Sequence, residues 1–287
     1  MNILLIGATG QVGGDLLRNN AAHKIEAPTR DELDLASPAQ VVDAIRTRRP
    51  DMVINCAAFH NVPLCEQEPE QAFRINCVAV RDLAAACADT GAWFLTFSSD
   101  YVFRGDRRTP YAEGDLPGPV QFYGITRLAG ENAALAAAPE RAVVVRTCGL
   151  YGRSGAKAKG GNFVDRCVDL GRNNPVIEMS SDQTVAPTSS DDLSRAVLSL
   201  IAHPGMRPGI YHLVNEGSCT WYEFTKAIVE RLGLKTEVRP VDRGGRTGTM
   251  RRPLYSVLAN ERARALGIAL RPWREALAAY LDIRHRG

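Results

Sequence analysis

NILLIGATGQVG, residues 2–13, is the stretch that decides the fold of this 287-residue chain. Its first five residues are an apolar run, which is typical of a strand buried on both faces of a parallel sheet. Glycines follow at positions 7, 10 and 13, and an apolar-periodic segment continues through Leu16 and Leu17. Glycine lets the backbone approach a pyrophosphate, and a helix N-terminus offers unpaired N–H groups and a favourable dipole. The stretch therefore predicts a strand, a glycine turn and a helix, with a dinucleotide site at the turn.

The alternation of apolar runs and helical periodicity continues to about residue 147. Five repeats of this kind indicate an α/β fold, a doubly wound parallel sheet of the Rossmann type with helices on both faces. The predicted strands are residues 2–6, 24–27, 51–56, 93–97 and 142–147; the predicted helices include residues 38–48, residues 69–90 and a helix that begins near Phe122.

Beyond residue 147 the alternation loosens. A loop rich in Gly, Lys and Ser runs to Gly161, a composition typical of a connection that covers a substrate. Helices are predicted over residues 191–202 and 221–232, with a strand over 209–214. We expect residues 1–148 to form a dinucleotide-binding domain with the catalytic residues. Residues 149–287 should form mainly a smaller substrate-binding part, with some segments returning to the first core.

Composition narrows the class of protein. With 45% hydrophobic and 23% charged residues the chain reads as an ordinary globular protein. Its 35 basic and 32 acidic residues leave a net charge of only +3, which argues against a nucleic-acid partner. No apolar run reaches the roughly 18 residues of a membrane span, and the chain enters its first strand without a signal-peptide n-region. We therefore expect a cytoplasmic protein that does not contact a membrane.

The seven cysteines follow no ligand pattern. Their number is odd, no C-x-x-C occurs, and most lie inside apolar stretches. Such cysteines are typical of reduced core thiols, so we expect neither disulfides nor a metal site.

Tyr123 and Arg127 lie one turn apart on the same face of a predicted helix. A phenol titrates about three units above neutrality, so it exchanges protons usefully only where a positive charge stabilises its phenolate. Ser99 follows the run 93–97, where a parallel strand ends at the mouth of the sheet and a hydroxyl is placed to hold a substrate carbonyl. Taken alone, Tyr-x-x-x-Arg is also common on ordinary helix faces, and both interpretations stay open on this pattern.

The context of these residues is more specific. The chain carries SDYVFRG at residues 99–105, PYAEGD at 110–115 and YGITRLAGE at 123–131. These segments resemble the dTDP-4-dehydrorhamnose reductase family, within the extended short-chain dehydrogenase/reductase superfamily, and the resemblance runs from end to end. One departure is conspicuous, because the family's catalytic lysine is Arg127 here.

The resemblance implies an NAD(P)H site. Arg30 favours NADPH because arginine accommodates a 2′-phosphate, whereas Asp31 keeps NADH open. Asp34 and Leu35 are similar to a pair that meets adenine in the family, although Asp34 is equally well explained as a cap or turn residue. The implied cofactor residues are Gly7, Gly10, Gln11, Val12, Gly13, Arg30, Asp34, Leu35, Ala57, Ala58, Tyr123 and Arg127.

The resemblance also implies a catalytic set of Ser99, Tyr123 and Arg127. Tyr123 would protonate the alkoxide formed at a sugar C4 while Ser99 hydrogen-bonds the same oxygen. Arginine retains the family's positive charge, but it is planar and longer, so the geometry toward the nicotinamide ribose differs. The implied substrate residues are Ser99, Asp100, Tyr101, Val102, Phe103, Gly149 and Asn162.

Several positions leave alternatives open. Gly149 stands where the family has a tryptophan, His60 is either a pocket residue or locally hydrogen-bonded, and Asn76 is either functional or bonded within its helix.

We expect a homodimer that reduces the C4 ketone of a nucleotide-linked 4-keto-6-deoxy sugar, most like the reductase of dTDP-L-rhamnose biosynthesis. The alternative is a non-catalytic, NADP-binding regulatory subunit similar to that of methionine adenosyltransferase. Arg127 and Gly149 favour that alternative, whereas Ser99 and Tyr123 favour the enzyme.

Overall fold

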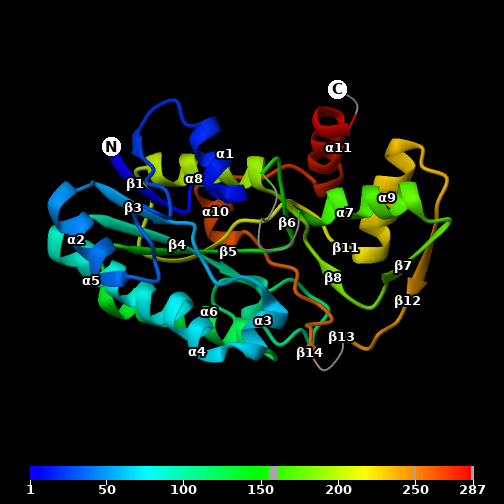
Figure 1. Cartoon of the computed structure of the whole chain (residues 1–287), viewed down its shortest axis with the longest axis horizontal. Helices are drawn as coiled ribbons and strands as arrows, with labels where there is room; N and C mark the ends of the chain where they lie inside the picture. The colour runs from blue at the N-terminus through cyan, green and yellow to red at the C-terminus, as the bar shows by residue number, and fades with distance from the viewer. Residues whose placement is uncertain (155–160, 248–249, 286–287) are drawn as a thin grey trace.

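The computed structural model describes residues 1–154, 161–247 and 250–285. Its centre is a six-stranded sheet in the order β10-β5-β4-β3-β1-β2, and each neighbouring pair is parallel. Helices lie above and below this sheet (Figure 1). The predicted doubly wound α/β fold is thus confirmed. The strands are β1 (Asn2–Ile6), β2 (Lys24–Glu26), β3 (Met52–Asn55), β4 (Trp93–Ser99), β5 (Ala142–Thr147) and β10 (Gly209–His212).

Apolar residues alternate between the two faces of the sheet. Ile3 and Leu5 of β1 pack into the same buried cluster as α1 (Gln11–Asn19) and α8 (Ser190–Ala202). Leu4 and Ile6 belong to the opposite cluster, with α2 (Pro38–Arg48), α5 (Ala79–Thr90) and α6 (Phe122–Ala137). Because both faces are covered, every residue of β1 after Asn2 is buried, as the continuous apolar run predicted.

The predicted helix over residues 69–90 is confirmed in its bounds, but a π-helical turn that the sequence did not reveal interrupts it. The segment is divided into α4 (Pro69–Phe73), a π-helical turn η1 (Arg74–Val78) and α5. Asn76 in this turn bonds to Phe59 and Thr126, outside its own helix. A π turn holds one residue more than an α-helical turn, and the apolar periodicity of the sequence does not reveal it. The sequence analysis also missed α3 (Val62–Gln67), whose N-cap is Asn61.

The smaller part surrounds an aromatic cluster that contains Tyr151, Phe224 and Trp273. Beyond residue 147, the predicted helix over 191–202 and strand over 209–214 are present as α8 and β10, and both belong to the core of the six-stranded sheet. The predicted helix over 221–232 is present in the smaller part as α9 (Trp221–Leu232), whereas α7 (Phe163–Asn173), α11 (Trp273–His285) and the small strand pairs were not predicted. Residues 155–160 of the predicted covering loop lie outside the described residues. The remaining elements are α7 (Phe163–Asn173), α9 (Trp221–Leu232), α10 (Glu261–Ala265), α11 (Trp273–His285), β6 (Leu150–Tyr151), β7 (Val176–Ser180), β8 (Thr184–Val185), β9 (Thr188–Ser189), β11 (Cys219–Thr220), β12 (Glu237–Val241), β13 (Arg246–Thr247), β14 (Met250–Arg251) and the short helix η2 (Asp100–Val102).

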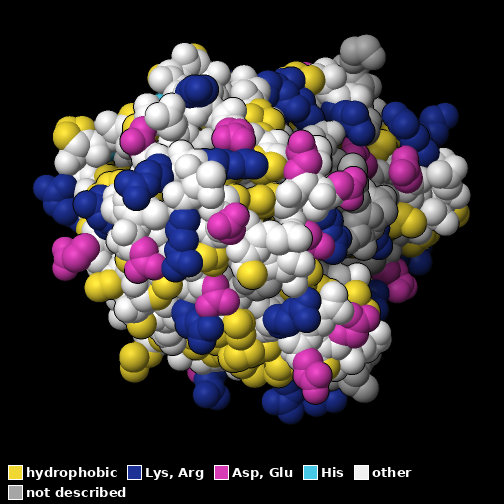
Figure 2. All heavy atoms as spheres, turned by 60° about the vertical axis from the view of Figure 1, so that its left-hand side comes forward, with side chains coloured by type: hydrophobic (Ala, Val, Ile, Leu, Met, Phe, Trp, Pro, Cys, Tyr) yellow, Lys and Arg dark blue, Asp and Glu magenta, His cyan; other side chains and the backbone are white. Residues whose placement is uncertain are grey.

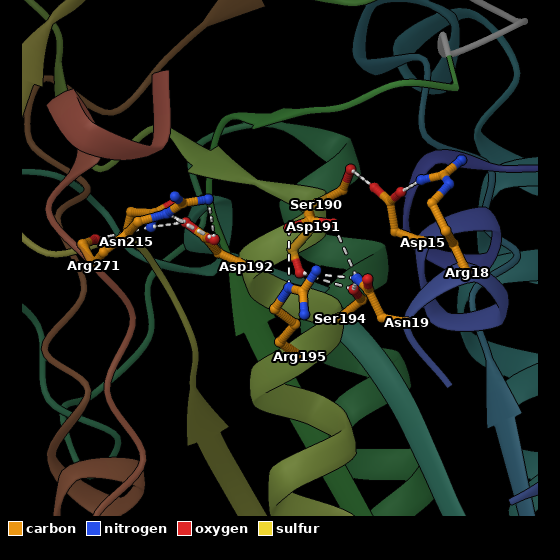
Figure 3. A network of polar contacts seen from close by, with 10 residues as sticks. All are labelled: Asp15, Arg18, Asn19, Ser190, Asp191, Asp192, Ser194, Arg195, Asn215 and Arg271. Atoms are coloured by element: carbon orange, nitrogen blue, oxygen red, sulfur yellow. Dashed lines mark hydrogen bonds and ion pairs between the residues drawn. The ribbon is translucent and has the colours of Figure 1, made fainter. Parts of the chain in front are cut away.

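A polar network ties the first helix to the later part of the chain (Figure 3). The Asp15 carboxylate on α1 is buried and accepts a hydrogen bond from Ser190, the first residue of α8. Two residues on, Asp192 pairs with Arg271 at 2.7 Å and accepts from Asn215. These contacts join the helix that follows the glycine turn to the segment that precedes α11.

Basic and acidic side chains are interspersed on the face shown in Figure 2. Within the described ranges, no helix has the length and apolar character needed to cross a membrane, and no group of His, Cys, Asp or Glu is arranged to hold a metal ion. The seven cysteines, all within the described ranges, form no disulfide, and five of them are buried.

Candidate active site

The glycine turn lies between the carboxyl ends of β1 and β3. Gly7 has φ +82°, and a Cβ there would stand 2.8 Å from the backbone nitrogen of Ala57. A Cβ on Gly13 would stand 2.4 Å from the Gly7 carbonyl oxygen. β1 has β2 on one side and β3 on the other, so the strand order reverses here. Doubly wound sheets bind dinucleotides at such a switch point.

The turn fits a dinucleotide. The N-cap of α1 is Gly10, whose missing side chain leaves the first N–H groups of the helix without a side-chain cap. The buried Gln11 Oε1 has no hydrogen-bond partner among the described residues. Glycines that keep the backbone open and an uncapped helix N-terminus, with its free N–H donors, are what a pyrophosphate site requires.

The residues expected near the adenine ribose occupy an exposed turn. Arg30 extends into solvent, with 77% of its side chain exposed, and forms a 3.4 Å ion pair with Asp34. Asp34 also accepts from the Ala36 amide at 2.9 Å, which is the turn role left open for it above. Leu35 is buried in the apolar cluster around α2.

Tyr123 is brought to Ser99 by a close contact between backbones. Ser99 ends β4 and accepts a hydrogen bond from the Tyr101 amide at 3.2 Å. α6 begins one residue before Tyr123, and Gln121 caps it by accepting from the Gly124 amide. A Cβ on Gly124 would stand 2.1 Å from the Tyr101 carbonyl oxygen. The glycine after Tyr123 therefore allows the start of α6 to lie against the segment that follows Ser99.

The surroundings of Tyr123 have opposing effects on the pKa of its hydroxyl. Burial raises its pKa above the usual value, because an apolar environment disfavours the phenolate, and Asp100 adds to the rise. The charge of Arg127 and the neighbouring Ser99 side chain lower it. The Arg127 guanidinium carbon lies 6.0 Å from the centre of the Tyr123 ring. The geometry thus places a positive charge near the Tyr123 phenol, where it favours the phenolate form.

Asn76 connects the segments around Tyr123 and Arg127 through hydrogen bonds. Its amide donates to the Phe59 carbonyl and the Thr126 hydroxyl, and its Oδ1 accepts from the Phe59 amide. The same Oδ1 lies 3.4 Å from Arg127 Nη1. Asn76 therefore connects the π turn, the loop after β3 and α6, a positioning role that neither alternative of the sequence analysis described.

The residues of the predicted substrate segment, 100–103, differ in how far their side chains are exposed. Val102 and Phe103 are fully buried in the core, so only their backbone is available to a ligand. Asp100 is 3% exposed and bonds to other side chains of the protein. Tyr101 is partly exposed, accepts from Arg252 Nη1 at 2.6 Å and has its ring centre 6.2 Å from that of Tyr123.

The other expected substrate positions lie further along the chain. Gly149 has φ +54°, and an atom of the Trp221 ring lies 3.2 Å from where its Cβ would be. An aromatic side chain thus stands beside the position where the family tryptophan is missing. Asn162 caps α7 and donates to the Gly152 carbonyl and the Tyr280 hydroxyl, all within the smaller part. His60 Nδ1 lies 3.3 Å from the Ala58 carbonyl oxygen, the local contact considered above.

Two residues of this region were missed in the sequence analysis. Cys148 and Ser256 both donate to Asp100, although they lie 48 and 156 residues beyond it. Neither belongs to a spacing motif, so no local sequence signal pointed to them.

Comparison with known proteins agrees with this geometry. The family model for the RmlD substrate binding domain matches residues 1–285. A dTDP-4-dehydrorhamnose reductase of Mycolicibacterium smegmatis is 40% identical over 282 residues, covering 96% of this chain and 83% of the relative. A probable dTDP-4,6-dihydroxy-2-methyloxan-3-one 4-ketoreductase of Streptomyces antibioticus is 37% identical and covers 99% and 96%.

A solved structure extends the likeness to three dimensions. The dTDP-4-dehydrorhamnose reductase of Bacillus anthracis, in complex with NADP, has a TM-score of 0.90 at 32% identity and covers 99% of both chains. The chain therefore belongs to the RmlD substrate binding domain family, the NAD(P)-dependent dTDP-sugar ketoreductases of the extended short-chain dehydrogenase/reductase superfamily.

Proposed function

We propose that this chain reduces the C4 ketone of a nucleotide-linked 4-keto-6-deoxy sugar with NADPH, and that dTDP-4-dehydrorhamnose, on the route to dTDP-L-rhamnose, is its first candidate substrate. The observation that carries the proposal is the position of Tyr123 between Ser99 and Arg127, at the sheet edge that also holds the glycine turn. The reaction named for the Mycolicibacterium relative supports this substrate, while the name of the Streptomyces relative, a probable 4-ketoreductase, refers to a different dTDP-sugar.

The chemistry follows from the side chains. A reduced nicotinamide, when bound, supplies the hydride that C4 receives. Tyr123 gives its hydroxyl proton to the oxygen at C4, and the positive charge of Arg127 stabilises the phenolate that remains. Ser99 hydrogen-bonds the same oxygen and so stabilises the charge that develops there. We place the sugar between Tyr101 and the side of the site formed by Gly149 and Trp221. We also expect the protein to be a homodimer in the cytoplasm.

The experiment that tests the function is oxidation of NADPH and NADH with dTDP-4-dehydro-6-deoxy-L-mannose, followed at the nicotinamide absorbance. Cofactor binding is measured in parallel by calorimetry. Turnover with this sugar supports the reductase and its substrate. Tight cofactor binding without turnover of any 4-keto sugar would favour the regulatory subunit, the alternative that Arg127 raises.

Arg30 is expected to select NADPH. Arg30→Ala should weaken NADPH binding by about 10- to 100-fold, since a charged hydrogen bond to the 2′-phosphate contributes about 1.5–3 kcal/mol. NADH, which lacks this phosphate, should bind as before. Calorimetric titration measures both affinities. Arg46→Ala, which removes an exposed arginine paired with Asp89 on α5, is the charge control. Equal weakening of both cofactors would exclude Arg30 as the source of preference.

Arg127 is expected to act through its charge. Arg127→Lys should keep kcat within about tenfold of the parent, because the charge beside Tyr123 remains. Arg127→Met retains most of the stem without the charge and should lower kcat by roughly two orders of magnitude. Steady-state kinetics with the keto sugar separates the two variants. If Lys is as damaging as Met, the site depends on the guanidinium itself, whose Nη1 contacts Asn76.

A further inference from the structure

Asp100 sits at the centre of a buried cluster behind the catalytic serine. The Ser99 hydroxyl oxygen lies 2.9 Å from Asp100 Oδ1. Cys148, which follows β5, and Ser256, in the tail beyond β14, approach Asp100 Oδ2 at 3.1 and 2.6 Å. Asp100, Cys148 and Ser256 are each at most 3% exposed. We call these three residues with Ser99 the Asp100 cluster.

We propose that Asp100 is a positioning residue which, as a neutral acid, donates to the Ser99 hydroxyl oxygen and so turns the Ser99 hydrogen toward the substrate ketone. The inference rests on the proposed ketoreductase function. It assigns Asp100 to the support of Ser99 rather than to direct contact with the sugar.

The argument begins with the two oxygens of Asp100. A carboxyl oxygen has two lone pairs, and the thiol of Cys148 and the hydroxyl of Ser256 both donate to Oδ2. With Oδ2 fully used as an acceptor, the proton of a neutral Asp100 resides on Oδ1. Oδ1 is the oxygen that faces Ser99, and a separation of 2.9 Å serves donation in either direction.

The Ser99 hydroxyl then has a defined set of bonds. It offers one hydrogen and two lone pairs, and the Tyr101 amide already donates to it. Donation from a neutral Asp100 occupies the second lone pair and leaves the hydrogen free for a ketone. An ionised Asp100 reverses this, because Ser99 must then donate to Oδ1 and would face the ketone with a lone pair. Only the neutral acid makes Ser99 a donor to the substrate.

The surroundings favour the neutral form. Burial raises the pKa of Asp100, against the hydrogen bonds from Ser256, Cys148 and Ser99, which lower it. Those three neighbours are uncharged in the hydrogen-bonding form they adopt here.

Other titratable groups also face Asp100. Tyr101 follows it on η2, Tyr123 approaches from α6, and an ionised Asp100 raises the pKa of each. The positive charges beyond them are Arg252, which donates to the Tyr101 hydroxyl, and Arg127, which lies near the Tyr123 ring. A neutral Asp100 thus removes a negative charge that would oppose the phenolate of Tyr123.

The pH dependence tests the proposal. The neutral form is present below the raised pKa of Asp100 and is lost as the pH rises through it, so kcat should fall over that range. In Asp100→Asn the amide donates to Ser99 at every pH, while its oxygen accepts from Cys148 and Ser256. This variant should keep kcat within about tenfold of the parent and lose that limb of the profile. A loss of roughly 10²- to 10³-fold, as for a removed oxyanion donor, would overturn the proposal.

Ser256 gives a second test of the same arrangement. Ser256→Ala frees a lone pair on Oδ2, allows the acid proton to move away from Ser99, and should lower kcat about tenfold at unchanged KM. Ser256→Cys restores a donor and should recover kcat. Cys148→Ser keeps a donor at the other position and serves as the matched control. A fall in thermal stability without a change in kcat would show that Ser256 is only structural and would overturn its role.

A spectroscopic measurement separates this inference from the proposed function. The infrared difference spectrum between the parent and Asp100→Asn at neutral pH should show the carbonyl band of a protonated carboxylic acid, and the band should vanish at higher pH. Its absence would mean that Asp100 is ionised and would overturn the inference, whether or not the protein turns over a sugar. A band in a protein that reduces no sugar would support the proton on Asp100 while the proposed reaction fails.

Discussion

Tyr123→Phe should lower kcat for the keto sugar by about 10²- to 10⁴-fold, the usual contribution of a positioned general acid. The variant removes only the hydroxyl oxygen that interacts with Ser99 and keeps the ring beside Tyr101. The substitution does not alter the glycine turn that contains Gly7 and Gly13, so the affinity for NADPH should be nearly the same as in the parent. Stopped-flow or steady-state NADPH oxidation measures kcat, and calorimetry measures the affinity.

Tyr211→Phe is the matched control for this experiment. The Tyr211 hydroxyl is also held by protein groups, since it bonds to the backbone of Arg207 at the start of the loop into β10. Its removal should cost about 0.5–1.5 kcal/mol of stability and leave kcat unchanged. If Tyr123→Phe retained the parent kcat, Tyr123 would not be the proton donor. If both variants lost activity equally, the effect would be one of stability.

Glu131→Gln should lower the free energy of unfolding by about 3–5 kcal/mol, because it leaves the Arg146 charge buried without a partner. Glu131 on α6 and Arg146 on β5 form a bidentate pair at 2.6 and 2.9 Å, and both are at most 2% exposed. His212 lies next to Arg146, and burial lowers its pKa to about 3, so it is a neutral imidazole that supplies no negative charge in place of Glu131. Urea unfolding measures the difference as a shift of the midpoint at constant slope.

An exposed pair provides the comparison. Asp89→Asn breaks the ion pair with Arg46, in which both side chains are more than half exposed, and should change stability by less than about 1 kcal/mol. Replacing the buried pair together, as in Glu131→Leu with Arg146→Met, should recover much of the loss, because no charge then remains unpaired. A loss below about 1 kcal/mol in Glu131→Gln would contradict the view that this pair holds α6 on the sheet.

Local patterns in the chain were sufficient for the frame of the fold. The apolar run before Gly7 predicted β1, and the glycine spacing predicted the turn and the start of α1. The helix predicted to begin near Phe122 begins there as α6. Such signals are readable because strand and helix periods and the freedom of glycine act over a few neighbouring residues.

The positions of the candidate functional side chains could be predicted from the sequence only in part. The family pattern implied substrate contacts for Asp100, Tyr101, Val102 and Phe103 alike. The structure buries the side chains of Asp100, Val102 and Phe103 and leaves Tyr101 partly exposed. Neighbours in the sequence diverge in this way because η2 turns successive residues toward different elements. The π turn at Asn76 likewise depends on bonds to Phe59 and Thr126, which lie on other segments.

The sequence by itself determined the first five strands of the sheet, the glycine turn and the pair of Tyr123 with Arg127, since each depends on residues close together along the chain. Only the tertiary structure decided that Asn76 supports Arg127, that Trp221 stands beside Gly149, and that Cys148 and Ser256 meet at Asp100. These contacts join segments that the sheet and the smaller part bring together from positions up to 156 residues apart. Their existence depends on how whole elements pack, and no local period encodes it.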